Sequence, residues 1–498
     1  MKKNICNIFG RRNKQSGILL VEAIVFGSIA IVMIGALISW AAVNIKASRL
    51  ALEREQAMLI AEAGEDYYRW HLAHASGDYK DGNATSTGPY VHQFYDKDGN
   101  DIGAFTLTIT PPITGSTLVT IVSRGTIVAD PTVHRTLKVQ LGIPSLAKYA
   151  MVTNAVVYYG CGDEVFGPIH SNVGVGFFAC GSGAQPIAHN VVTSAVSTFN
   201  DGSNHFGVYT SVSPADPTPP ASVPNRPDVF VSGRQFPVPA VDFSSITSDL
   251  SAIKANAQAS GFYRAASGGQ GYKVVLKTND TFDLYKVNSL LSTPGGCTNS
   301  QGQTGWGTWS IKNDVPNGAP TGGAATLLGN YPFPANGLMF FEDHVWIEGQ
   351  INSARLTIAA GAFPVNSATY KNIIVNNNLI YTNFDGTDAI GLIAQGNFLV
   401  GMASAANLTI DGAIIAQNGK TIRYYYNGCG ASYDLRTSLT TYGMFASNGQ
   451  GYFYYSGGGN SGYASQPASY DGNFLFGPPP SFPLTSSSYQ IISWGEIP

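Results

Sequence analysis

"KQSGILLVEAIVFGSIAIVMIGALISW", residues 14–40, is an apolar run long enough to cross a bilayer, and it contains a single carboxylate, Glu22. An ionised side chain in hydrocarbon costs at least about 2.5–3.5 kcal/mol, so such a residue is usually kept for a function and given a partner. The first 17 residues carry five basic side chains and no acid, and the positive-inside rule keeps that end in the cytoplasm. We therefore expect a single-pass membrane segment with a functional carboxylate.

The sequence that follows predicts that the same helix continues beyond the membrane. "KASRLALEREQAMLIAEAGEDYYRWHL", residues 46–72, lacks proline, is rich in strong helix formers, and places Leu52, Leu59, Ala63 and Tyr67 at helical spacings. We expect one helix from about residue 18 to about residue 71. At 1.5 Å per residue it would be roughly 80 Å long, much more than a bilayer requires.

The start of this helix resembles a known processing site. Gly17, the apolar tetrapeptide at 18–21 and Glu22 are similar to the prepilin-peptidase site of type IV pilins and of the pseudopilins of type II secretion. The resemblance implies cleavage after Gly17 and methylation of the new amino terminus on Ile18, which stands where the family more often has phenylalanine. It also implies prepilin peptidase and other pilins or pseudopilins as partners.

The resemblance gives Glu22 a role. In a filament of packed helices, its carboxylate would meet the amino group of Ile18 on a neighbouring subunit. Opposite charges attract strongly at low dielectric, and a wrong register would leave a buried charge unpaired. Glu22 would then set the register during assembly. The alternative is an ordinary membrane anchor in which Glu22 is incidental.

Composition indicates an exported β-rich protein of two or three domains. The chain has 498 residues, of which 12% are charged, 57 are glycine, 26 are tyrosine and 25 are phenylalanine. Its net charge is −3, and loss of the five leader cations would give −3 − 5 = −8. That charge argues against electrostatic binding of nucleic acid. No metal or cofactor motif is present, so no cofactor is expected.

Five cysteines divide between the two sides of the membrane segment. Cys6 lies on the cytoplasmic side, whereas Cys161, Cys180, Cys297 and Cys429 would be exported. An even set in an oxidising compartment is compatible with disulfides, and four cysteines permit three connectivities. The short separation favours the pair Cys161 and Cys180, which leaves Cys297 with Cys429. Four buried free thiols are the alternative.

Residues 75–143 predict a small antiparallel meander packed on the helix. Runs such as "FTLTIT" and "HRTLKVQL" alternate apolar and polar residues with turn signals between them. Asp96, Asp98 and Asn100 imitate the start of a calcium loop, but the sixth position is Asp101 rather than glycine. A hairpin turn is therefore favoured over a metal site. A long helix followed by a meander resembles the pilin head.

The remaining chain predicts a larger, mainly β domain. Short β-branched runs such as "ARLTIAAG", "AIGLIAQGNFLV" and "LTIDGAIIAQ" are each followed by turn residues, a rhythm that suits a parallel β-solenoid or β-helix. The uneven spacing keeps a jelly roll or sandwich as the alternative. "FGPIHSN" at 166–172, "GLIAQGNFLV" at 391–400 and "SYQIISWGEI" at 488–497 also resemble β-helical ectodomains of uncharacterised pilin-like envelope proteins. That resemblance implies an architecture and no activity.

Two features separate the strand-rich parts. "SPADPTPPASVPNRP", residues 213–227, predicts an extended spacer. "SSITSDLSAIKANAQASGF" places Ile246, Leu250, Ile253 and Ala257 on one stripe of a helix behind a serine cap, so we expect that helix to lie across the β domain or at its end.

These features give an α+β pilin module followed by a mainly β domain. The predicted segments are a leader at 1–17, the long helix at 18–74, the meander at 75–143, first β-helical rungs at 144–205, a region of spacer, helix and insertion at 206–335, and the main β-helical domain with the C-terminal tail at 336–498.

An active site is not evident from the sequence. The candidate acids Asp385, Asp388 and Asp411 stand in glycine-rich turns, where aspartate usually bonds the backbone. His170 and Ser171 are neighbours in a strand and so point to opposite faces. We therefore expect a protein that is not an enzyme. A membrane-anchored β-helix enzyme or binding protein for polysaccharide is the alternative, and tyrosine-rich loops could stack on sugars.

The predicted function is that of a minor, tip-located pilin-like subunit of a type IV pilus or pseudopilus. It would sit in the cytoplasmic membrane with its N-terminus inside and then enter an extracellular filament or the cell surface. The large β domain would serve adhesion or assembly, with a glycan or another surface as its ligand.

Overall fold

The computed structural model describes residues 16–113, 116–455, 459–475, 477–486 and 488–498. The chain divides into two compact units. The first contains the residues up to Ile109 together with Ile121–Val139 and Trp494–Pro498, and the second contains Thr110–Thr120 and Gln140–Ser493. Most of the expected leader, including Cys6, lies outside the described residues.

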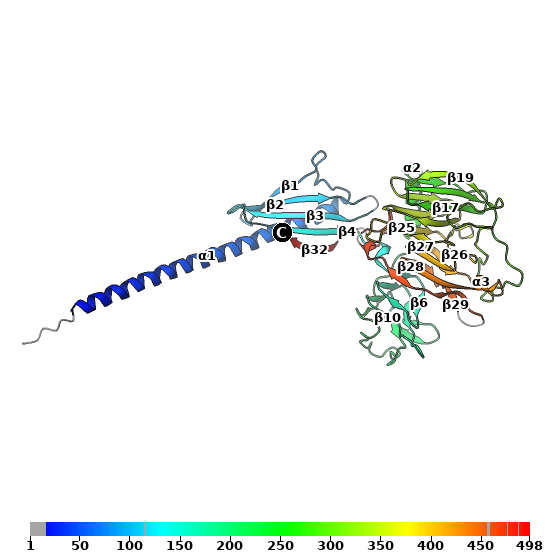
Figure 1. Ribbon diagram of the computed structural model, residues 1–498, viewed down its shortest axis with the longest axis horizontal. Helices are drawn as coiled ribbons and strands as arrows, with labels where there is room; N and C mark the ends of the chain where they lie inside the picture. The colour runs from blue at the N-terminus through cyan, green and yellow to red at the C-terminus, as the bar shows by residue number, and fades with distance from the viewer. Residues whose placement is uncertain (1–15, 114–115, 456–458, 476, 487) are drawn as a thin grey trace, which may run out of the picture. The chain divides into compact units, whose positions relative to one another are not determined.

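The long N-terminal helix is confirmed. Helix α1 runs without interruption over Ser16–His74, a length of 59 residues, and its N-terminal part extends well beyond the sheet of the first unit in Figure 1. Leu52 and Leu59, two of the residues at helical spacing, are 61% and 56% exposed. The contact with the sheet is made on another face, whose buried apolar residues are Ala57, Ile60, Ala61, Tyr68 and Leu72.

Small residues bring α1 close to the sheet of the first unit. A Cβ atom added to Gly125 would lie 2.1 Å from the carbonyl oxygen of Ala57 and 2.6 Å from the backbone nitrogen of Ala61. The Ser123 hydroxyl donates a hydrogen bond of 2.7 Å to the Ala61 carbonyl. Helix and sheet therefore meet almost backbone to backbone, which explains why alanine rather than leucine is buried here.

The sheet of the first unit has five strands in the order β1-β2-β3-β4-β32. The strands are β1 (Tyr90–Tyr95), β2 (Asp101–Thr110), β3 (Val119–Ile127), β4 (His134–Gly142) and β32 (Gln490–Ile497). The Asp96 carboxylate accepts hydrogen bonds from the backbone of Asp98 and Asn100 and from the Asn100 amide, so this segment is a β1–β2 turn, as expected.

Strand β32 corrects the sequence analysis, which had assigned residues 488–497 to the large β domain. In the structure it lies beside β4, and Arg135 holds it with two hydrogen bonds to the Glu496 carboxylate. The C-terminal strand thus completes a sheet that the N-terminal part of the chain begins. Its sequence alternates apolar and polar residues but contains nothing that identifies a partner so distant along the chain.

The second unit is mainly β, as expected, and its longest feature is a ladder of parallel strands. In spatial order the strands are β16 (Phe262–Arg264), β20 (Leu338–Phe341), β22 (Arg355–Ala360), β25 (Ala389–Ala394), β27 (Asn407–Arg423), β28 (Leu435–Gly449), β5 (Met151–Thr153), β8 (Ile169–Ser171), β11 (Val192–Ser194) and β15 (Arg234–Gln235). Strands β25, β27 and β28 lie side by side in Figure 1. The first strand-rich part is therefore stacked directly on the last long strand.

The sheet also contains other pairings, so a regular solenoid repeat does not describe all of it. Strands β17 (Gly271–Lys277), β18 (Thr281–Val287) and β19 (Ala325–Pro332) pair antiparallel, while β17 also pairs parallel with β21 (Val345–Gln350). The remaining elements are β6 (Val156–Tyr159), β7 (Glu164–Val165), β9 (Gly174–Phe177), β10 (Ile187–Ala188), β12 (Thr198–Asn200), β13 (Asn204–Phe206), β14 (Val208–Thr210), α2 (Ile246–Ser260), β23 (Ile373–Ile374), β24 (Leu379–Ile380), β26 (Phe398–Val400), α3 (Ala431–Asp434), β29 (Tyr454–Tyr455), β30 (Ser461–Ser465) and β31 (Ala468–Tyr470).

Both faces of the parallel ladder are buried. Ile358, Leu392 and Ile414 align across three strands on one face, within one apolar cluster. Their neighbours Ile393 and Ile415 belong to a second cluster, on the other face, together with the apolar stripe of α2. All four residues of that stripe are buried, as expected. Parallel strands covered on both faces read as nearly continuous apolar runs, which is what these segments are.

The proline-rich segment is folded rather than an extended spacer. The Asp216 carboxylate accepts two hydrogen bonds from the Arg234 guanidinium and one from the backbone of Thr210. Arg226, only 5% exposed, donates to the carbonyls of Val212 and Pro214. Proline sets backbone angles but does not prevent charged neighbours from pinning a segment to the domain.

Candidate functional site

The first candidate site is the apolar surface of α1. From Ile18 to Ile45 its large apolar side chains are exposed, with exposed fractions between 47% and 73%. Among the described residues, α1 is the helix that is long and apolar enough to span a membrane, and its most apolar window is not buried at all. In water such a surface would be unfavourable by about 25 cal/mol for each Å² of apolar area, so it needs lipid or protein around it.

The predicted processing residues lie at the start of this surface. Gly17 is in the first turn of α1, and Glu22, five residues further on, is exposed among apolar side chains. Among the described residues, no side chain forms a hydrogen bond or ion pair with the Glu22 carboxylate. Cleavage after Gly17, methylation at Ile18 and the role of Glu22 remain predictions.

A second apolar stripe continues along α1 beyond a bilayer-length segment. Ile45, Leu52, Leu59 and Trp70 are between 56% and 69% exposed. Their spacings of seven, seven and eleven residues place them on one face of a helix with 3.6 residues per turn. The face that packs on the sheet is a different one, and within the described residues this stripe remains exposed.

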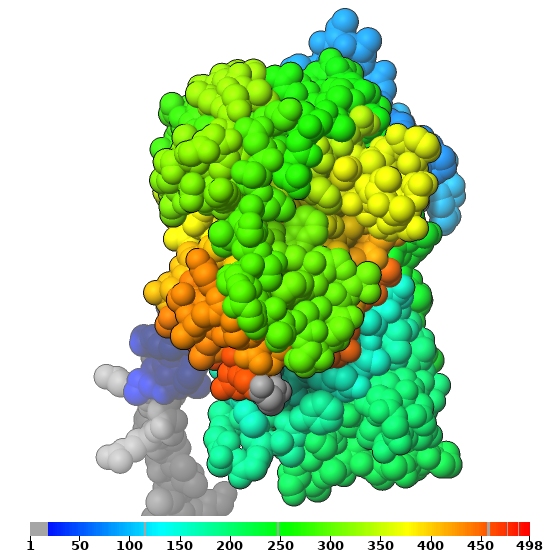
Figure 2. Space-filling model, turned by 90° about the vertical axis from the view of Figure 1, so that its right-hand side faces the viewer, coloured from blue at the N-terminus to red at the C-terminus, as the bar shows by residue number. Residues whose placement is uncertain are grey.

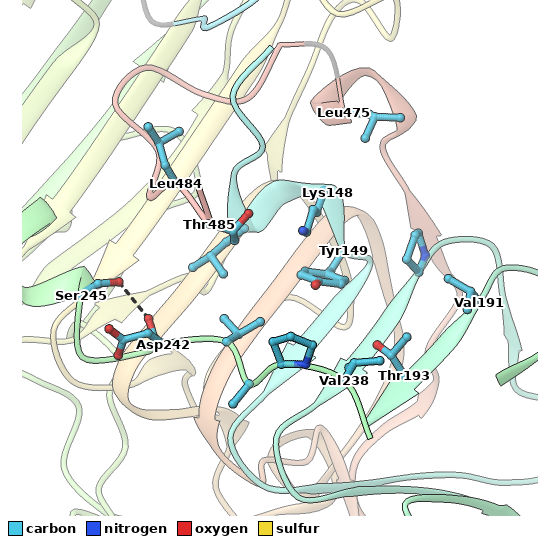
Figure 3. Close-up of a pocket in the computed structure, with 15 residues that line it drawn as sticks. Lys148, Tyr149, Val191, Thr193, Val238, Asp242, Ser245, Leu475, Leu484 and Thr485 are labelled. Atoms are coloured by element: carbon cyan, nitrogen blue, oxygen red, sulfur yellow. Dashed lines mark hydrogen bonds between the residues drawn. The ribbon is translucent and has the colours of Figure 1, made fainter. Parts of the chain in front are cut away.

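The second candidate site is a surface pocket of about 720 Å³ in the second unit. Figure 3 shows Lys148 and Tyr149 beside the pocket, with Thr193, Asp242 and Thr485 around it. The Lys148 Nζ atom lies 5.0 Å from the centroid of the Tyr149 ring. These residues come from segments more than 300 positions apart, so local sequence patterns do not indicate the pocket.

The pocket contains two ionisable groups whose pKa values are shifted in known directions. Burial lowers the pKa of Lys148, and hydrogen bonds from Ser244 lower the pKa of Asp242. The Asp242 carboxylate accepts from the Ser244 hydroxyl at 2.6 Å and from its backbone at 2.8 Å, which occupies one of its oxygens. An aromatic ring beside an amine and hydroxyl groups can stack on a sugar and hydrogen-bond to it.

His170 lies next to this pocket and has a structural environment. It is 1% exposed, and burial lowers its pKa. Its Nδ1 atom lies 2.9 Å from Thr193 Oγ1, and its Nε2 atom lies 2.9 Å from Asn172 Oδ1. Its ring centroid is 5.5 Å from that of Tyr149. The Ser171 hydroxyl instead donates to the Ala155 carbonyl, so the two residues do not form a nucleophile and base pair, as expected.

The three candidate acids bond backbone groups. The Asp388 carboxylate accepts from the backbone of Ala354 and Thr382, and Asp385 accepts from the backbone and hydroxyl of Thr387. Asp411 accepts from the backbone of Tyr381, and burial raises its pKa to about 6. None of the three lines the pocket of Figure 3.

Four cysteines of the second unit form two disulfides, Cys161–Cys180 and Cys297–Cys429, with Cα–Cα distances of 5.3 and 4.1 Å. These are the pairs that the sequence analysis preferred. The tyrosine-rich loop beside Cys429 bears on the alternative in which tyrosines stack on sugars. The rings at 424–426 are at most 4% exposed and pack in a core, so they are not available for stacking on sugars. No cluster of metal-ligating side chains occurs among the described residues.

Comparisons with known proteins add little to these observations. No protein family model matches the chain, and no curated protein matches it. Among solved structures, the competence-associated pilin ComZ from Thermus thermophilus is similar over 89% of this chain and 97% of that chain, at 13% identity and a TM-score of 0.29. A likeness of that size does not establish function, so the functional assignment depends on the residues described above.

Proposed function

We propose that this protein is a pilin-like structural subunit that is anchored in the membrane and then assembled through α1 with other pilin-like chains. The observation that carries the proposal is the two-part character of α1. Its first part exposes large apolar side chains on all sides, whereas its last turns pack on a sheet through alanine, glycine and tyrosine. A helix of 59 residues is about three times longer than a bilayer requires.

The stripe of Ile45, Leu52, Leu59 and Trp70 supports assembly over simple anchoring. A membrane anchor needs apolar side chains only across the hydrocarbon, about 20 residues. The stripe continues to residue 70, well beyond that length, and its side chains are at least 56% exposed. Such a stripe suits packing against another helix.

In this proposal prepilin peptidase cleaves after Gly17, and the new amino group of Ile18 is methylated. Glu22 then pairs with the amino terminus of a neighbouring subunit. A carboxylate surrounded by exposed apolar side chains supports this role, because packing the helices would bury it and leave it in need of a cation. Before assembly the protein lies in the cytoplasmic membrane with its N-terminus inside.

The processing step is tested by Gly17→Ala in the full chain. We expect a membrane-retained species that still carries residues 1–17, visible as a larger mass. Gly27→Ala is the matched control, because it lies on the same helix and a Cβ atom there would meet nothing within 4 Å. Normal processing of Gly17→Ala would remove the proposal that this is a peptidase site.

The role of Glu22 is tested by a matched pair of variants. Glu22→Gln removes the charge with little change in shape, and Glu22→Asp keeps it. We expect Glu22→Gln to lose most filament incorporation and Glu22→Asp to retain more of it, with both variants processed and folded. Equal incorporation of both variants would show that charge pairing is not what Glu22 does.

The position of the subunit is proposed from its size. Residues 75–498 form a much larger head than a helix-packed shaft allows at every position, so a minor subunit at the tip is favoured. Immunogold labelling of sheared filaments should place label at one end. Regular labelling along the filament would contradict the tip position.

The second unit is proposed to act by binding rather than by catalysis, with its parallel ladders forming the coils of a β-solenoid. The pocket at Lys148 and Tyr149 supports a glycan or similar polar surface as ligand. Lys148→Gln should weaken binding in a glycan array, whereas Lys97→Gln, an exposed lysine of the first unit, should not. Turnover of a glycan that depends on an acidic residue would instead support the alternative, a polysaccharide enzyme.

A further inference from the structure

A buried cluster of one amine and two carboxyl groups lies in the second unit, apart from both candidate sites. Lys273 is on β17, Glu348 is on the neighbouring strand β21, and Asp314 is in the long loop that precedes β19. The Lys273 and Glu348 side chains are 1% and 4% exposed, and that of Asp314 is 17% exposed. A fully buried lysine in a strand is rare unless it is paired or chemically used.

The contacts within the cluster are short. The Lys273 Nζ atom lies 2.6 Å from Asp314 Oδ1 and 3.0 Å from Glu348 Oε1. It also donates to the carbonyls of Val315 and Gly318, at 3.0 and 3.1 Å. The other Glu348 oxygen accepts from the Asn377 amide at 2.6 Å. The amine therefore contacts both carboxyl groups, and the Asn377 amide, 3.4 Å from Asp314 Oδ2, contacts both as well.

Charge counting points to a proton held inside the cluster. With all three groups ionised, it would carry one uncompensated negative charge in a buried place, which is costly. Burial raises the pKa of Glu348, and the nearby Asp314 raises it further, against the opposing effect of Lys273. A protonated Glu348 leaves the cluster neutral.

We propose that Lys273 and Asp314 form an intramolecular amide bond, with Glu348 as the proton carrier. A proton first passes from the Lys273 ammonium to the Asp314 carboxylate, which gives an amine and a carboxylic acid. The Nζ lone pair then attacks Asp314 Cγ. Glu348 donates a proton to the departing hydroxyl group and takes one from Nζ. One C–N bond forms, one C–O bond breaks, one water leaves, and Glu348 ends as it began.

Two physical effects favour this condensation here. The fold holds the reacting groups together, and well-oriented intramolecular reactions reach effective concentrations of about 10⁵–10⁸ M. Burial also excludes bulk water, which would otherwise solvate the ions and hydrolyse the product. The step needs no oxidant, reductant or cofactor.

The bond would tie a long loop to the sheet. Residues 288–324 connect β18 to β19, and the Cys297–Cys429 disulfide already fixes one end of this loop. Figure 2 shows this green segment lying against the orange segment that contains Cys429. An amide at Asp314 would fix the other end. Unlike the disulfide, it would hold under reducing conditions.

The direct test is the intact mass of the full chain, purified in detergent, reduced and denatured. We expect a mass lower than that of the processed sequence by one water, and a peptide containing Lys273 joined to one containing Asp314 after digestion. An unchanged mass would overturn the proposal. Loss of one ammonia instead of one water would also overturn it, because that would identify Asn377 as the reacting partner.

Variants separate the roles of the residues. Lys273→Gln and Glu348→Gln should show the full mass, and Glu348→Gln keeps one oxygen that can accept from Lys273 and from the backbone of Asn317, so it is expected to fold. Lys277→Gln is the matched control, because Lys277 also pairs with an aspartate, Asp283, at 2.8 Å, but is 40% exposed. It should still lose one water at the buried cluster. Persistent water loss in Glu348→Gln would contradict its role as the proton carrier.

Discussion

The first unit leaves its longest apolar surface, the N-terminal part of α1, exposed, whereas the second unit buries apolar side chains on both faces of its parallel ladder. Within the described residues, both disulfides belong to the second unit, and the first unit is held by packing and by ion pairs such as Arg135–Glu496. The first unit therefore requires lipid or protein around α1, whereas the second unit already covers the apolar faces of its parallel ladder. Substitutions that act on only one of the two units can test this.

The largest effect is expected from the longer disulfide of the second unit. Cys297–Cys429 joins residues that are 132 positions apart in the sequence, and Cys161–Cys180 joins residues that are 19 positions apart. Loop-closure entropy predicts losses of about 5 and about 3 kcal/mol when each pair is replaced by serine. Hydrogen-exchange mass spectrometry of the full chain should show faster exchange in the second unit and unchanged exchange at residues 57–72. Equal losses for the two pairs would contradict the entropic explanation.

A pH effect of about 2–3 kcal/mol is expected from Asp411. Burial raises its pKa from 3.8 to about 6, the nearby Asp471 adds to this, and the hydrogen bond from the Tyr381 backbone opposes it. The folded state then binds the proton more tightly than the unfolded state, so this contribution is present below about pH 4 and is lost as the pH rises through about 6. Asp411→Asn should abolish that loss in melting temperatures measured from pH 4 to 7.

His344 should make stability depend on pH in the opposite direction, so it serves as the comparison with Asp411. Burial lowers its pKa to about 4, and its Nδ1 atom accepts from the Asn372 backbone at 2.9 Å. Its contribution is present above about pH 6.5 and is lost as the pH falls toward 4. His344→Asn should therefore reduce acid sensitivity, whereas Asp411→Asn should reduce the loss on raising the pH. If both substitutions changed the pH dependence of the melting temperature in the same direction, burial would not be what shifts the pKa values of these two groups.

In the first unit, Gly125→Ala should cost about 1–3 kcal/mol by overpacking the helix against the sheet. The added Cβ atom would meet backbone atoms of Ala57 and Ala61, which have no side-chain freedom to move aside. Gly77→Ala is the control in the same unit, because its Cβ atom would meet nothing within 4 Å. Exchange should rise at residues 57–72 in Gly125→Ala and stay unchanged in the second unit. Protection equal to that of the control would show that helix and sheet do not pack so closely.

Local patterns predicted the features that depend on local physics. The apolar run and the absence of proline predicted α1, and the stripe at Ile246, Leu250, Ile253 and Ala257 predicted α2 and its buried face. The buried face of α1 was not predicted, because apolar spacing indicates a helix without showing which face meets the sheet, and close approach to Gly125 selects alanine there. Which apolar stripe meets the sheet is decided by the sheet and not by the helix.

Features that depend on distant parts of the chain could not be predicted. Strand β32 pairs with β4 across some 350 residues, and the pocket joins residues of segments equally far apart. The cluster of Lys273 and Glu348 had a local signal that was overlooked. "YKVVL" and "VWIEG" each place one charge within an otherwise apolar strand segment, and a charge in a buried strand requires a partner. Only the fold shows that the partners are each other and Asp314.

The smallest effect on stability, and the sharpest separation of the two units, is expected from the outer stripe of α1. Leu52→Ser with Leu59→Ser changes side chains that are more than half exposed, and such changes usually alter stability by at most about 0.5 kcal/mol for each residue. If this stripe packs against another subunit, the double variant should fold and be processed normally but lose filament incorporation.

Arg54→Ser with Glu55→Ser, two exposed polar residues of the same turns, is the control and should incorporate normally. Normal incorporation of the leucine variant would restrict assembly to the membrane part of α1. Unfolding of the first unit would instead show that the stripe packs within the chain.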